Sequence, residues 1–207
     1  MINSSEYIRA WEQRVSADTA HIPHKEHFFG IYKKAFEKTS LHGKTVIDFG
    51  CGGGWTGKYL FAEKKIKAYL GIDIAQRSLE AAKKNLSEYP NSVFLLIDPN
   101  ALPDFTQMTA DYFVSLSCIQ HFPDKEYLDY FLRSLNKSGI KNIILQVKYS
   151  KETKFREVPY KTTHDIGNAC VTNSGYILSQ MTNYKMDCIP RERSEYQYMR
   201  LKLNELD

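Results

Sequence analysis

Short apolar runs alternate with helical patterns through most of the chain. The runs rich in β-branched and aromatic residues are Thr45–Phe49, Ala68–Ile72, Val93–Ile97, Tyr112–Leu116 and Asn142–Val147. Helical segments follow the first run to about Lys65, cover Ser78–Leu86, and continue from Pro123-Asp124 to about Leu135. This repeated order of strand and helix predicts a parallel sheet with helices on both faces.

The two ends of the chain depart from this rhythm. Before the first strand, the spacing of Tyr7, Ile8, Trp11 and Val15 predicts a helix capped by Asn3 or Ser4, and a second helix is expected near Lys25–Lys38. After the last parallel strand, a helix is expected over Tyr176–Met181 and strands over Tyr184–Ile189 and Tyr196–Leu203. A short turn around Arg191–Ser194 would join these strands into an antiparallel hairpin at the sheet edge.

These patterns together predict one doubly wound α/β domain over residues 1–207. Its sheet is mostly parallel and seven-stranded, with an antiparallel C-terminal hairpin. We expect residues 1–43 to form an N-terminal helical cap or lid, residues 44–147 the ligand-binding core, and residues 148–207 a loop, a helix and the hairpin on the acceptor side.

Composition adds mainly exclusions. The apolar runs are too short to span a bilayer, and the first residues show neither a basic start nor an apolar stretch, so we expect a cytoplasmic protein without a membrane partner. The cysteines, Cys51, Cys118, Cys170 and Cys188, are far apart in the sequence, which argues against a metal site and a disulfide framework. The net charge of +4 permits an anionic small molecule but does not favour a nucleic-acid partner.

The most informative segment is a glycine-rich turn between a strand and a helix. It reads Asp48-Phe49-Gly50-Cys51-Gly52-Gly53-Gly54-Trp55-Thr56-Gly57. Glycines let a ligand approach the main chain, and the following helix offers free N–H donors. The spacing also fits the dinucleotide fingerprint, so a nicotinamide-dependent oxidoreductase is one alternative.

Acidic residues at the ends of three successive strands distinguish these alternatives. Asp48 ends the first strand, Asp73 the second, and Asp98 follows the third. A carboxylate at Asp48 suits a cationic ligand and would repel a pyrophosphate, whereas Asp73 suits ribose hydroxyls and Asp98 an adenine amine. The set therefore fits an adenosyl ligand without phosphates.

From about Val46 to Val147 the chain resembles the class I S-adenosylmethionine (SAM)-dependent methyltransferases. Four stretches carry the resemblance: Asp48–Gly54, Gly71-Ile72-Asp73, Asp98 with Ala101-Leu102-Pro103, and Ser115–Asp124. The resemblance implies SAM as cofactor and S-adenosyl-L-homocysteine as product. The cofactor-binding residues it implies are Asp48, Gly50, Cys51, Gly52 and Gly54 for the methionine end, Asp73 and Ile74 for the ribose, Asp98 and Pro99 for the adenine, and Ser117 and Cys118 after the fourth strand. Pro99 departs from the family pattern, because a small residue is commoner there.

His121 is the candidate catalytic residue. It follows the fourth strand, and imidazole suits proton transfer near neutrality. The alternative is that His121 only hydrogen-bonds to the backbone or packs on the methionine end of the ligand. The N-terminal arm, with Tyr7, Trp11, His21, His24 and His27, is expected either to fold over the cofactor or to serve as a packed helical cap.

The acceptor is expected near Tyr149–Asn173, a polar stretch that carries several basic residues. We predict methyl transfer to an oxygen or nitrogen of a small polar acceptor, of a phosphorylated or sugar-like kind. A nucleic-acid methyltransferase is a weaker alternative, because Ser117-Cys118-Ile119-Gln120 stands where base-amine enzymes carry an Asn/Asp-Pro-Pro-aromatic tetrad. A non-catalytic SAM-binding subunit is the third alternative.

Overall fold

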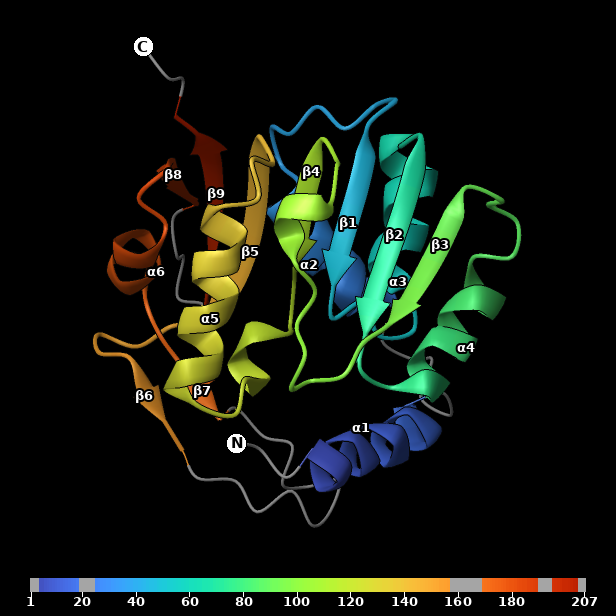
Figure 1. Cartoon of the computed structure of the whole chain (residues 1–207). Helices are drawn as coiled ribbons and strands as arrows, with labels where there is room; N and C mark the ends of the chain where they lie inside the picture. Colours follow the sequence, from blue (N-terminus) through green and yellow to red (C-terminus); the bar gives the residue numbers. More distant parts are fainter. Residues whose placement is uncertain (1–3, 19–24, 157–168, 190–194, 205–207) are drawn as a thin grey trace.

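The computed structural model describes residues 4–18, 25–156, 169–189 and 195–204. Its centre is a seven-stranded sheet in the order β3-β2-β1-β4-β5-β9-β8 (Figure 1). The pairs among β1 to β5 are parallel, whereas β9 pairs antiparallel with both β5 and β8. The predicted fold class is therefore confirmed, while the predicted turn at Arg191–Ser194 lies outside the described residues.

The strands lie within a few residues of the predicted positions. They are β1 (Thr45–Phe49), β2 (Ala68–Asp73), β3 (Ser92–Leu96), β4 (Tyr112–Ser115), β5 (Asn142–Lys148), β8 (Tyr184–Ile189) and β9 (Tyr196–Leu203). A separate antiparallel pair, β6 (Lys154–Phe155) and β7 (Cys170–Val171), was not predicted, because two-residue strands leave no periodic pattern.

The helices cover the two faces of the sheet unequally. The α-helices are α1 (Ser4–Asp18), α2 (Lys25–Ala35), α3 (Trp55–Tyr59), α4 (Gln76–Asn85), α5 (Lys125–Asn136) and α6 (Ser174–Gln180). A π-helical turn, Leu60–Lys64, extends α3, and 3₁₀ turns occupy Phe105–Gln107 and Ile119–His121. The connection from β3 to β4 thus contains only a three-residue 3₁₀ turn, where the other parallel crossovers carry an α-helix.

Two apolar layers enclose the sheet. One joins it to α5 and α6, with Phe49, Phe113 and Phe131 in ring contact. The other joins it to α2, α3 and α4, through residues such as Tyr69 and Leu86. Because strand side chains alternate between faces, each parallel strand supplies both layers, which is why these strands read as nearly continuous apolar runs.

Helix α1 lies across the end of the sheet toward which β1, β2 and β3 point (Figure 1). In parallel α/β sheets this carboxyl-terminal end is where ligands bind. Within the described ranges, no helix is long and apolar enough to cross a membrane.

Candidate functional site

The glycine-rich turn after β1 has the backbone conformation that glycine favours. Gly50, Gly52 and Gly54 have φ of 75°, 52° and 78°, a region that other residues adopt at a cost. Gly54 is the N-cap of α3. A Cβ at Gly52 would meet nothing within 4 Å, so open space lies beside the main chain at this point. The turn therefore presents its backbone to open space at a helix N-terminus.

Gly50 and Cys118 join the turn to the segment after β4. A Cβ built at Gly50 would lie 2.3 Å from the Cys118 sulfur, so the two segments pack in direct contact. Burial raises the pKa of both Cys51 and Cys118, which keeps these thiols protonated at neutral pH. The structure thus brings together three of the predicted site residues, with the two cysteines acting as packing groups.

Asp48 is buried on the face of the sheet that α2 and α3 cover. It is 1% exposed, and Tyr69 Oη donates a 2.6 Å hydrogen bond to its Oδ2. Burial raises the pKa of Asp48 to about 7, although hydrogen bonds from Tyr69 and Thr56 lower it and the charge of Asp73 raises it further. The carboxyl group therefore supports the turn from behind, and a direct contact with a cationic ligand stays a prediction.

Asp73 lies at the end of β2, opposite the glycine turn. Its Oδ2 accepts a 2.8 Å hydrogen bond from the Gly52 amide, and its Oδ1 accepts one of 2.9 Å from the Ala75 amide. Burial raises the pKa of Asp73, while backbone hydrogen bonds from Ala75, Gly52 and Ile74 lower it. Two of the predicted cofactor residues, Asp73 and Ile74, are thus next to Gly52 and its open space.

Asp98 and Pro99 follow β3 in a tight turn. Asp98 is exposed, and its Oδ1 accepts a 2.8 Å hydrogen bond from the Asn100 amide. Pro99 is buried beside it. The backbone of Ile97 is bonded to Asp73 O at 3.0 Å, so this turn begins next to the end of β2.

Ser117 depends on a residue that sequence reasoning missed. Its φ is 54°, and both its amide (2.7 Å) and its hydroxyl (3.1 Å) donate to Oε1 of Gln146. Gln146 is fully buried in β5, and its Nε2 donates to Tyr198 Oη on β9 at 3.3 Å. A polar residue at a central position of an apolar strand, Ile143–Val147, was the signal that could have revealed it.

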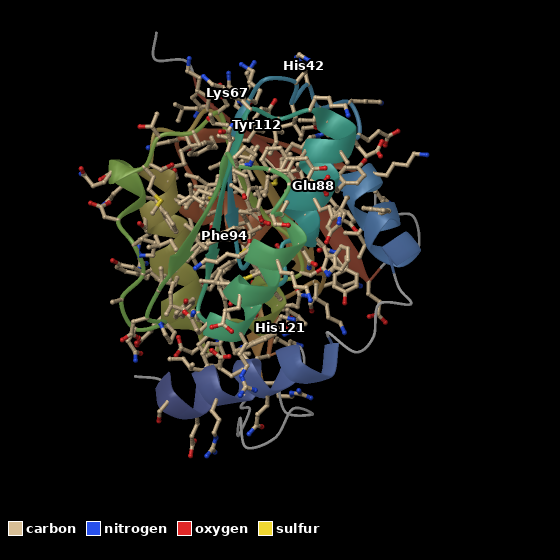
Figure 2. All side chains as sticks on the ribbon, turned by 90° about the vertical axis from the view of Figure 1, so that its right-hand side faces the viewer. His42, Lys67, Glu88, Phe94, Tyr112 and His121 are labelled. Carbon is tan, nitrogen blue, oxygen red and sulfur yellow. The ribbon has the colours of Figure 1, made fainter. Side chains whose placement is uncertain are left out.

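His121 ends the 3₁₀ turn after β4 and lies against α1 (Figure 2). Its ring contacts Trp11 edge to face at 4.9 Å between centroids, and its carbonyl accepts a 3.1 Å hydrogen bond from Tyr7 Oη. The predicted aromatics of the arm thus meet the candidate catalytic residue. The side chains of His21, His24 and His27 lie outside the described part of the chain.

A second contact holds the middle of α1, at the residue after Trp11. Glu12 accepts hydrogen bonds from the first two amides of α4, Gln76 at 2.5 Å and Arg77 at 3.1 Å. The N-cap residue of α4, Ala75, has no side chain that could do this. Helix α1 is therefore attached on both sides of the glycine turn, and Glu12 was not among the predicted residues.

On the acceptor side, the described part of Tyr149–Asn173 is the region around β6 and β7. Here Lys148 forms an ion pair with Glu195 at 3.3 Å and Lys154 with Glu152 at 3.1 Å. Both cations are thus partly neutralised. Residues 157–168, the middle of the predicted acceptor stretch, lie outside the described residues.

Comparison with known proteins shows a similarity to methyltransferases over part of the chain. Residues 46–139, from β1 through α5, match the family model described as a methyltransferase domain. Over 100 residues the chain is 33% identical to the ubiquinone biosynthesis O-methyltransferase of Nitrosomonas europaea. The aligned segment covers 48% of this chain and 42% of that protein. The chain therefore spans less than half the length of this curated relative.

Solved structures share the fold over nearly the whole chain. A DhpI–S-adenosylhomocysteine complex superimposes with a TM-score of 0.69 at 13% identity, over 96% of each chain. A putative methyltransferase in complex with the Haloferax volcanii Trm112 activator gives 0.67 at 13% identity, over 99% of this chain and 100% of that one. The matched segment spans the strands that build the glycine turn and its surroundings, so residues 46–139 are similar in sequence to a methyltransferase domain, and the solved structures share the fold of the whole.

Proposed function

We propose that this protein binds SAM in the space beside Gly52 and transfers its methyl group to an oxygen or nitrogen of a small polar acceptor. The observation that carries the proposal is the glycine turn, whose main chain faces open space between Asp73 and the start of α3. A main-chain cradle beside a carboxylate fits an adenosyl ligand that carries no phosphates.

The site residues divide the cofactor among the strand ends. Asp73, with Ile74, would hold the ribose, because its Oδ2 is bonded to the Gly52 amide beside the open space and the carboxylate keeps capacity to accept a further hydrogen bond. Exposed Asp98, with Pro99, would meet the adenine. The backbone of Gly50–Gly54, supported by Asp48 and faced by Ser117 and Cys118, would hold the methionine end.

Catalysis in this arrangement rests on positioning and on exclusion of water. SAM supplies an electrophilic methyl group when bound, so the protein must mainly align the acceptor and keep the site dry. Helix α1, attached at His121 and at the N-terminus of α4, is placed to act as the lid. His121 would serve as the general base for an oxygen acceptor or position the segment after β4, and its contact with Trp11 supports the second role.

The acceptor proposed here is small and polar, with a sugar-like or phosphorylated group. Basic residues around β5 and β6 support it, but the ion pairs of Lys148 and Lys154 favour a neutral, hydroxyl-rich acceptor over a phosphorylated one. Turnover assays with matched phosphorylated and unphosphorylated acceptors at several salt concentrations would separate these kinds.

The cofactor proposal is tested by calorimetric titration of SAM, S-adenosylhomocysteine and NADH. We expect Asp73→Asn to weaken adenosyl binding by about 10- to 100-fold, because charge-assisted hydrogen bonds contribute roughly 1.5–3 kcal/mol. Asp187→Asn is the matched control, since Asp187 forms a surface ion pair with Arg200 on the far edge of the sheet. No adenosyl binding by the wild type, or a preference for NADH, would reject the proposal.

The role of His121 is tested by His121→Ala. Turnover that falls while SAM affinity is kept would assign it as the base. Intact turnover with weaker SAM binding would assign it to positioning.

A second candidate is a SAM-binding subunit that requires a partner for turnover. One structural neighbour is a putative methyltransferase bound to an activator, and this observation favours the candidate. Tight SAM binding without turnover on any acceptor would be its signature.

A further inference from the structure

Strand β3 is an edge of the sheet that lacks the usual protection against pairing. Its sequence, Ser92-Val93-Phe94-Leu95-Leu96, has no charge and no proline, and Val93, Leu95 and Leu96 are 61%, 37% and 48% exposed. The opposite edge, β8, carries exposed Lys185 and Asp187. Charged side chains are a common means of blocking edge pairing, so the two edges differ in their readiness to bind another strand.

The exposure of β3 has a structural cause. Val93 and Leu95 are opposite Leu70 and Ile72 of β2, on the face that α5 covers further along the sheet. A helix between β3 and β4 would cover this face, but that connection has only the turn Phe105–Gln107. Figure 2 looks onto the β3 edge of the sheet, with Phe94 near the centre of the view.

The backbone of β3 is suited to symmetric pairing. Asn91 O accepts from Tyr69 and the Ile97 amide donates to Asp73, so the odd-numbered residues between them bond to β2. The amide and carbonyl groups of Phe94 and Leu96 therefore face the free edge. An antiparallel pair of two copies centred on Phe94 would bond the Phe94 groups to each other and the Leu96 amide to the Ser92 carbonyl of the other copy, whose amide already donates to Tyr89 O. It would also set Val93 of one copy against Leu95 of the other.

Charges at the two ends of β3 are complementary in the same arrangement. Lys67 is bonded through its carbonyl to Asn91, and Lys83 borders Ser92 and Val93, so both lie at the amino end. Asp98 and Asp104 follow the carboxyl end, and none of these four forms an ion pair with another described residue. Antiparallel pairing places the acidic end of one copy near the basic end of the other.

We propose that β3 pairs with β3 of a second copy, which forms a two-fold symmetric dimer with a continuous sheet. Such an isologous contact needs one self-complementary strand, and β3 has the apolar faces, the free backbone groups and the opposed charges for it. This inference is independent of the cofactor and the acceptor.

Sedimentation velocity of the full chain over about 1–100 μM tests the proposal. We expect a species of twice the 24.0 kDa chain mass. Added salt should weaken the association of the two copies, because it screens the charges at the ends of β3. Val93→Lys should raise the dissociation constant about tenfold or more, because a buried ammonium would face Leu95 of the other copy. Tyr130→Lys is the matched control, since Tyr130 is an apolar side chain 52% exposed on α5.

Hydrogen exchange measured at low and high protein concentration locates the contact. The amides of Phe94 and Leu96 should become protected at high concentration in the wild type and in Tyr130→Lys, but not in Val93→Lys. A monomer at all concentrations, or a dimer that Val93→Lys leaves intact, would overturn the proposal. If the chain is a monomer at all concentrations, a different protein would be the candidate partner for this edge.

Discussion

The two halves of the proposed site are built in different ways. On the β1–β2 side, consecutive residues make the site: a glycine turn, and Asp73 bonded to the Gly52 amide. On the β4–β5 side, Ser117 is held in a left-handed conformation by Gln146, which lies 29 residues further along the chain. The first half is encoded locally and can be read as a motif, whereas the second depends on tertiary packing.

The contact between the halves at Gly50 gives the largest expected effect. In Gly50→Ala, a Cβ with φ near 75° would lie 2.3 Å from Cys118 Sγ and 2.7 Å from its Cβ. Backbone strain and overpacking together predict a loss of about 5 kcal/mol in the free energy of unfolding. Denaturant unfolding measures this loss.

Gly43→Ala is the matched control for this substitution. Gly43 also has a positive φ, 68°, but a Cβ there would meet nothing within 4 Å. It should lose only the strain part, about 1–2 kcal/mol. Equal losses in both variants would show that Cys118 does not constrain the turn.

Sequence patterns predicted the strands and the glycine turn of the local half, and they missed the contacts that build the other half. The strands, the glycine turn and Asp73 follow from periodicity and backbone chemistry, and the fold was confirmed in full outline. Gln146 and Glu12 were missed, because their partners, Ser117 and α4, are distant in sequence. The exposed side of β3 was missed as well, since periodicity does not show which crossover lacks a helix.

Titration of Asp48 would test the support behind the local half. Its pKa of about 7 in the folded protein exceeds the ordinary value of 3.8, so the folded state binds a proton more tightly than the unfolded one. The contribution of protonated Asp48 to the free energy of unfolding is therefore fully present below pH 4. It falls by about 4 kcal/mol as the pH rises to 7.

Asp48→Asn should remove this dependence while keeping an oxygen that can accept from Tyr69. Urea unfolding of both proteins between pH 4 and pH 8 measures the difference. Asp73, whose pKa is also raised, titrates in both proteins, so the difference reports Asp48 together with its coupling to Asp73. Parallel curves would show that Asp48 stays ionised in the fold.

Gln146→Leu would test the distant half. It leaves the partly buried amide of Ser117 without its acceptor, which predicts a loss of about 2 kcal/mol in stability and weaker SAM binding. Tyr198→Phe removes only the 3.3 Å bond on the other side of Gln146 and should cost about 1 kcal/mol, with SAM affinity unchanged. Equal SAM affinities in the two variants would mean that Gln146 is structural and does not position Ser117.

The smallest expected effect concerns α1, which joins the two halves. Glu12 replaces the missing cap of α4, so Glu12→Gln, which keeps one acceptor oxygen, should cost about 1 kcal/mol or less. The loss should be local, because the core strands do not depend on α1. We therefore expect faster hydrogen exchange in α1 and the first turn of α4, with unchanged exchange in β1. If exchange in β1 rises equally, α1 is an integral part of the fold, and its proposed role as a lid over the two halves is wrong.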